Sequence, residues 1–219
     1  MSIVLNTSES KFLERARIAL TNAQNHAEIK PQLASFGLDD SKIAEGWAKY
    51  EIAKTAWESN QVEDSETKVA SNAYKQAYDE LESLFKRHRD QAQIFFKKQP
   101  DFLVRLGVKG NFPSTYAEFF DKTKAFYTAI QNNADIQKQL LLCKITPEIV
   151  TDCLAKHKNL LGLRANFDKE MGESQESTKS KNAQLLDLKE WMDDFDITAK
   201  IALYDSPQLL ESLGIFVRS

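Results

Sequence analysis

The chain has 219 residues, of which 42% are hydrophobic and 28% charged, and its formal net charge is −3. This composition can bury a core and excludes a disordered chain, and the near balance of charge argues against a general polyanion binder. Only 7 glycines and 5 prolines are present, which argues against a turn-rich β fold or a glycine-loop nucleotide site and favours long helices.

The first residues, Met1 to Thr7, lack the basic start and apolar run of a signal peptide. No apolar stretch approaches the roughly 20 residues that a membrane span needs. We therefore expect a cytoplasmic protein with no membrane partner. Cys143 and Cys153 are expected to be buried free thiols, because nothing in the sequence indicates an oxidising compartment.

An internal repeat organises the chain. When the sequence is compared with itself in the register that places Phe12 on Phe119, two halves align without a gap, and identical residues recur throughout. Further pairs in the same register include Ile29/Ile136, Leu81/Leu188, Pro100/Pro207 and Gly107/Gly214. We interpret this as a duplication, and residues paired in this register are called equivalent.

Each repeat is predicted to contain three long helices and a short one, because apolar residues recur at three- and four-residue steps. The second helix is expected to begin at Asp39 or Asp40 in the first repeat and at Pro147 in the second. The apolar pattern lapses at residues 60–65 and 168–174, where we predict turns. A third helix of about 30 residues is expected to follow each turn. Each repeat should end in a short helix stopped by Gly107 or Gly214.

The predicted fold is therefore all-α, with two tandem antiparallel three-helix bundle units. The first unit spans residues 8–108 and the second spans 115–216. Gly110 and Pro113 mark a linker at 109–114. A single merged helical bundle is the alternative.

Three polar residues fall on predicted apolar helix faces: Tyr50, His88 and His157. We expect buried side chains with satisfied hydrogen bonds, and we predict one between His88 and Tyr50. A metal or haem ligand is the alternative role for the histidines. The spacing of the three histidines does not match a known metal motif, so no cofactor is predicted.

Charge is reversed between equivalent positions of the two repeats. Basic residues at Lys86, Arg87 and Arg89 correspond to acidic residues at Asp193, Asp194 and Asp196. One interpretation is two independent solvated helix faces. The other is that opposite patches meet, either between the two units or between neighbouring molecules. The basic cluster lacks interleaved aromatic residues and does not indicate a nucleic-acid partner.

No catalytic motif is present: the sequence has no Gly-x-Ser-x-Gly, phosphate-binding glycine loop or Cys-x-x-Cys. The stretch 200–215, with Pro207-Gln208-Leu209-Leu210-Glu211 followed by Leu213-Gly214-Ile215, resembles the C-terminus of a group of uncharacterised bacterial all-helical proteins. That resemblance implies no activity. We expect a non-enzymatic interaction or scaffold protein that binds an unknown protein or itself, with a small-ligand or cofactor (metal or haem) binding bundle as the alternative.

Overall fold

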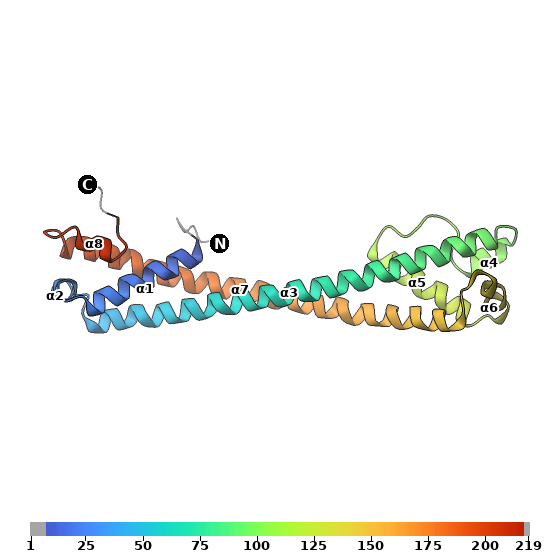
Figure 1. The fold of residues 1–219 in the computed structure, drawn as a ribbon, viewed down its shortest axis with the longest axis horizontal. Helices are drawn as coiled ribbons and strands as arrows, with labels where there is room; N and C mark the ends of the chain where they lie inside the picture. The colour runs from blue at the N-terminus through green and yellow to red at the C-terminus, as the bar shows by residue number, and fades with distance from the viewer. Residues whose placement is uncertain (1–7, 217–219) are drawn as a thin grey trace. The chain divides into compact units, whose positions relative to one another are not determined.

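The computed structural model describes residues 8–216, which form helices joined by turns and loops. The longest elements are two helices of 56 residues each, α3 (Asp40–Phe95) and α7 (Pro147–Ala202). The shorter ones are α1 (Glu9–Asn25), α2 (Ile29–Ser35), α4 (Pro100–Arg105), α5 (Tyr116–Gln131), α6 (Ala134–Leu140), the 3-10 helix η1 (Leu141–Cys143) and α8 (Leu209–Ser212) (Figure 1). The all-α prediction is confirmed for the described residues. None of the helices in that range is long and apolar enough to cross a membrane.

The turns predicted at 60–65 and 168–174 are wrong, because α3 and α7 run through these segments without a break. Polar contacts replace apolar packing there. Asn60, which is only 2% exposed, donates a hydrogen bond from Nδ2 to Oγ1 of Thr178 at 3.1 Å. The Ser174 hydroxyl bonds a carboxylate oxygen of Asp64 at 2.7 Å. The lapse in the apolar pattern therefore marks a polar stretch of helix packing.

The chain divides into two compact units, and each contains part of both long helices. Unit 1 comprises the described residues up to Ser65 together with those from Gly172 onward, and unit 2 is Glu66–Met171. These units differ from the predicted division into 8–108 and 115–216. The reason is that α3 and α7 do not turn back on themselves, so the third helix of each unit must come from the other repeat.

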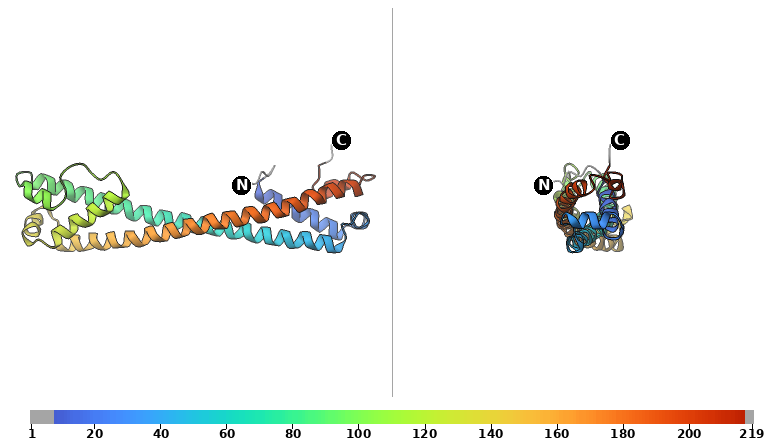
Figure 2. Two further views of the ribbon diagram at one scale, coloured as in Figure 1. Left: turned by 180° about the vertical axis from the view of Figure 1, so that it is seen from behind. Right: turned by 90° about the vertical axis from the view of Figure 1, so that its left-hand side faces the viewer.

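In unit 1, α1 packs beside the N-terminal part of α3 and the C-terminal part of α7 (Figures 1 and 2). The core combines residues from both ends of the chain. Fully or almost fully buried members include Leu20, Ile29, Leu33, Leu188, Phe195 and Leu203. Burial of side chains of this size contributes roughly 1.5–3 kcal/mol each relative to exposure.

In unit 2, α5 packs with the C-terminal part of α3 and the N-terminal part of α7 (Figure 1). This core is more aromatic than that of unit 1. Its fully buried rings are Phe85, Phe96, Phe119, Phe126 and Tyr127. Phe85, Phe119, Phe126 and Tyr127 meet edge to face in pairs, with centroids 5.1–6.4 Å apart, an arrangement that aromatic side chains prefer.

Two ion pairs show how the repeats combine. In unit 1, Lys49 of α3 pairs with Asp187 of α7 at 2.7 Å. In unit 2, Lys156 of α7 pairs with Glu80 of α3 at 2.9 Å. Lys49 and Lys156 are equivalent residues of the two repeats, and so are Glu80 and Asp187. Each lysine therefore pairs with the acidic residue of the other repeat.

The helix ends follow the predicted capping chemistry. Pro147 begins α7, and the hydroxyl of the preceding Thr146 accepts from the Ile149 N–H at 3.4 Å. Gly107 and Gly214 have φ angles of +65° and +68°, and each terminates a short helix in the left-handed region. Lys144 adopts the same region, with φ at +59°, although it carries a Cβ.

Candidate functional site

An open groove lies between α3 and α7 in unit 1. It encloses about 570 Å³ and includes residues of both long helices. The α3 side consists of Glu51, Ile52, Thr55, Ala56 and Ser59, and the α7 side of Glu176, Ser177, Ser180 and Gln184. We call this the α3–α7 groove.

Short side chains create the groove. Ala56 and Ser59 on α3 and Ser177 and Ser180 on α7 do not reach across to the facing helix. Ile52, which is 54% exposed, adds a large aliphatic side chain to the rim. The exposed surface of the groove is mainly apolar, although seven of the nine lining residues have polar or charged side chains. We call Ile52 and Ala56, which lie one turn apart on α3, the apolar strip. Sequence reasoning missed this site, since we interpreted its serine-rich α7 segment as the region after a turn.

The charged groups in the groove are acidic. Its two ionisable lining residues are Glu51 and Glu176. A carboxylate oxygen of Glu176 accepts from the Lys179 ammonium at 3.3 Å, one helical turn along α7. The groove therefore presents the apolar strip with carboxylates beside it.

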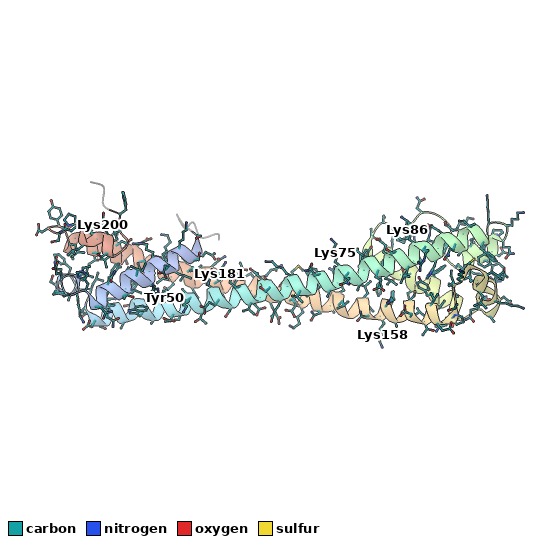
Figure 3. The ribbon with its side chains drawn as sticks, in the orientation of Figure 1. Tyr50, Lys75, Lys86, Lys158, Lys181 and Lys200 are labelled. Carbon is teal, nitrogen blue, oxygen red and sulfur yellow. The ribbon has the colours of Figure 1, made fainter. Side chains whose placement is uncertain are left out.

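The predicted basic patch is only partly a surface feature. Lys86 and Arg87 are exposed on α3 in unit 2, and Lys86 is labelled in Figure 3. Arg89 is 7% exposed and donates to the Gly110 carbonyl, with its guanidinium 5.9 Å from the centre of the Phe112 ring. Arg89 therefore holds the 109–114 segment against α3 and is not available to a partner.

The equivalent acidic patch is divided in the same way. Asp193 and Asp194 are exposed on α7 in unit 1. Asp196 accepts from the guanidinium of Arg15 at 2.5 Å, and Arg15 also donates to the Gly214 carbonyl at 3.2 Å. Asp196 thus positions the segment at Gly214 through Arg15. The exposed reversal of charge is confined to Lys86 and Arg87 against Asp193 and Asp194.

The predicted hydrogen bond between His88 and Tyr50 is wrong. His88 is 2% exposed in unit 2, and its Nδ1 lies 2.9 Å from the hydroxyl of Tyr127 on α5. Burial, with a smaller contribution from nearby Arg87, lowers the pKa of His88 to about 4. The ring is therefore neutral near pH 7 and can accept the Tyr127 proton. Tyr50, which is labelled in Figure 3, lies in unit 1. Its ring meets the Trp47 ring edge to face.

A thiol lies next to the His88–Tyr127 pair. Cys153 is fully buried on α7, and burial raises the pKa of its thiol. Burial also raises the pKa of Tyr127, and the neighbouring Cys153 adds to this shift. Cys143 and Cys153 are both free, as predicted, but Cys143 is only partly buried, whereas burial was expected for both. A neutral imidazole, a phenol and a thiol thus form a short polar row inside an apolar core.

His157 has a different environment. Its Nε2 lies 3.0 Å from the Phe120 carbonyl, and its ring lies over the Phe120 ring with centroids 3.8 Å apart. Burial lowers the pKa of His157, partly opposed by this backbone contact. His88 and His157 therefore bind separate protein groups, and in the described part of the chain they do not converge as metal ligands.

Comparison of the chain with protein-family models, with curated proteins and with solved structures gives no match.

Proposed function

We propose that this chain is a non-enzymatic interaction or scaffold protein, and that the α3–α7 groove receives an amphipathic helix of a partner protein. The observation that carries the proposal is the apolar strip in the open groove, where Ile52 is exposed on the rim. A helix that places its apolar face in such a groove is a recurring mode of recognition.

The charges of the groove define the partner. Because its ionisable lining residues, Glu51 and Glu176, are acidic, the complementary helix carries Lys or Arg beside its apolar stripe. Each exposed ion pair adds only about 0.2–1 kcal/mol. The apolar contact with Ile52 and Ala56 therefore supplies most of the affinity, and the charges select the orientation and the partner.

A peptide titration tests the proposal. The probe is a fluorescein-labelled helix of about five turns with leucines on one face and lysines on both sides of it, compared with a scrambled peptide of the same composition. Fluorescence anisotropy should show saturable binding of the amphipathic peptide only. Ile52→Arg should weaken binding at least about tenfold, since it removes apolar contact and adds repulsion.

Val69→Arg is the matched control. Val69 is 69% exposed on the same helix but lies in unit 2, so this variant adds the same charge outside the groove and should bind as the wild type does. Equal binding of the scrambled peptide, or an equal loss in both variants, would exclude the groove as a docking site.

The cofactor-binding alternative gains no support from the histidines. Nδ1 of His88 faces Tyr127, and Nε2 of His157 faces the Phe120 carbonyl. A metal or haem would have to bind the other ring nitrogen of each histidine. In the described residues, neither histidine belongs to a group of three or more His, Cys, Asp or Glu side chains that converge as metal ligands.

We also infer that a duplication produced the two repeats. The helix bounds support this inference, because α3 and α7 begin at equivalent positions, Asp40 and Pro147, and end at equivalent positions, Phe95 and Ala202. The left-handed residues Gly37 and Lys144 are also equivalent. In this inference, each three-helix unit takes two of its helices from one repeat and the third from the other.

A further inference from the structure

The two compact units carry opposite net charge. In its described residues, unit 1 has 11 basic and 19 acidic side chains and a net charge of −8. Unit 2 has 17 basic and 13 acidic side chains and a net charge of +4. The small overall charge of −3 therefore conceals an acidic unit and a basic unit.

Each unit also exposes large apolar side chains beside its charges. On α7 of unit 1, Asp193 and Asp194 are followed on the same side by Ile197 and Ile201, which are 59% and 56% exposed. Tyr204, which is 82% exposed, follows just after the helix ends. Steps of three and four residues keep the positions within α7 on one helical face. We call these residues and Tyr204 the acidic face.

The equivalent face of α3 belongs to unit 2. Lys86 and Arg87 are followed on the same side by Asp90, whose carboxylate lies 3.7 Å from the guanidinium of the buried Arg89. Ile94, which is 78% exposed, and Lys97, just after the helix ends, come next. We call Lys86, Arg87, Ile94 and Lys97 the basic face. Ile94 and Ile201 are equivalent residues of the two repeats, so an aliphatic contact is present on both faces, while Lys86 and Arg87 correspond to Asp193 and Asp194.

These charges are mostly free of partners. Among the described residues, Lys86, Arg87 and Asp194 form no salt bridge, and Asp193 pairs only with Lys189 one turn away on its own helix. An exposed pair of this kind contributes about 0.3–0.5 kcal/mol. An opposite charge on another molecule can therefore replace it at little cost.

We propose that the acidic face of one molecule binds the basic face of a second copy of this chain. The inference rests on the proposed interaction function and names a partner for it. Opposite charges would steer the two faces together and fix their register, and the exposed isoleucines would be buried at the contact.

The contact joins two different surfaces, so it is heterologous. A bound pair still has one free acidic face and one free basic face. Further copies can add to both ends until a ring closes, or without limit if it does not. Such assembly is the behaviour expected of a scaffold.

Sedimentation velocity of two charge-reversal variants tests the proposal. K86E/R87E has two acidic faces, and D193K/D194K has two basic faces. Each variant alone should remain a 25.0 kDa monomer, whereas an equimolar mixture should associate. The wild type should associate at about 50 mM salt and dissociate at about 500 mM, where charges are screened over a few ångströms.

Two control variants isolate the contribution of these two faces. K122E/K124E makes the same change in net charge on exposed residues of α5 in unit 2 and should associate as the wild type does. Ile52→Arg should also self-associate, so a failure of groove binding is distinguishable from a failure here. A wild type that is monomeric at both salt concentrations, a mixture that does not associate, or an equal loss in K122E/K124E would overturn the proposal. Circular dichroism of each variant verifies folding.

Discussion

A single hydrogen bond explains why a histidine is tolerated in the core of unit 2. Tyr127 is fully buried and needs an acceptor for its hydroxyl proton, and neutral His88 supplies it at 2.9 Å. In the repeat alignment, Phe195 is equivalent to His88 and Leu20 is equivalent to Tyr127. Leu20 has no hydroxyl group, so no acceptor is needed there. The two polar residues therefore depend on each other.

We expect this pair to make stability depend on pH. The folded-state pKa of His88 is about 4, below the ordinary 6.5, so between these values the unfolded chain binds more protons. The unfolding free energy should fall as pH drops through this window, by roughly 3 kcal/mol from His88. Urea unfolding at several pH values measures it.

His88→Phe is the reference variant for this measurement, and His157 remains in both proteins. The unfolding free energy of this variant should fall less steeply between pH 6.5 and 4. At pH 7 the substitution should lower the unfolding free energy by about 1–3 kcal/mol, because the Tyr127 hydroxyl loses its His88 acceptor. Tyr127→Phe in the same chain should recover part of that cost. Equal pH slopes in the wild type and His88→Phe would contradict the assignment.

The sequence indicated that His88 would be buried but not what it would bond. An apolar helix face is visible in a periodic pattern, and His88 and His157 both lie on one. The partner of His88 lies on α5, 39 residues away. Choosing Tyr127 over Tyr50 requires knowing which helices share a unit, and residue spacing along one helix does not contain that information.

At the scale of helices, a glycine and a tryptophan fit together in unit 1. A Cβ at Gly46 of α3 would clash with Cη2 of Trp191 on α7, and would lie 2.6 Å from Cζ2 of the same ring and 2.8 Å from Cδ2 of Leu20 on α1. The Trp191 ring stacks on Phe195, with centroids 5.5 Å apart and planes at 19°. Gly46 is equivalent to Cys153, and Trp191 is equivalent to Leu84. The larger Trp191 therefore faces the smaller Gly46, and the smaller Leu84 accompanies the larger Cys153.

This packing predicts that the cost of Gly46→Ala depends on its background. In the wild type it should destabilise by about 1–3 kcal/mol, because the indole ring and Leu20 block the new methyl group. In Trp191→Leu the cost should be smaller, because the indole contact is gone and only the contact with Leu20 remains. Chemical denaturation measures both effects.

Gly162→Ala is the control for this prediction. Nothing lies within 4 Å of a Cβ built at Gly162 in α7, so this substitution should stabilise by up to about 1 kcal/mol in both backgrounds. If Gly46→Ala cost the same with and without Trp191, the proposed steric fit would be incorrect.

Helix ends were easier to predict than helix continuity. The start of α7 at Pro147 and the stops at Gly107 and Gly214 depend on local chemistry, which is visible in the sequence. The break predicted at 60–65 was wrong, because Asn60 is buried through a hydrogen bond to Thr178, 118 residues away. A polar stretch appears as a turn when its distant partner is unknown.

At the scale of the molecule, each compact unit contains residues of both repeats. This arrangement forms the α3–α7 groove, whose lining residues at 51–59 and 176–184 come from different repeats. Tandem bundles would not bring these residues together. The proposed docking site therefore depends on the pairing of α3 with α7 inside unit 1.

Cysteine cross-linking tests this pairing most directly. Lys49 bonds Asp187 at 2.7 Å inside unit 1, whereas Lys49 and Glu80 lie many turns apart on one continuous helix and belong to different units. A short bismaleimide, with the linked peptides identified by mass spectrometry, should join the pair in Lys49→Cys/Asp187→Cys within a single chain and should not join the pair in Lys49→Cys/Glu80→Cys. The opposite result, a link between positions 49 and 80 and none between 49 and 187, would contradict the account.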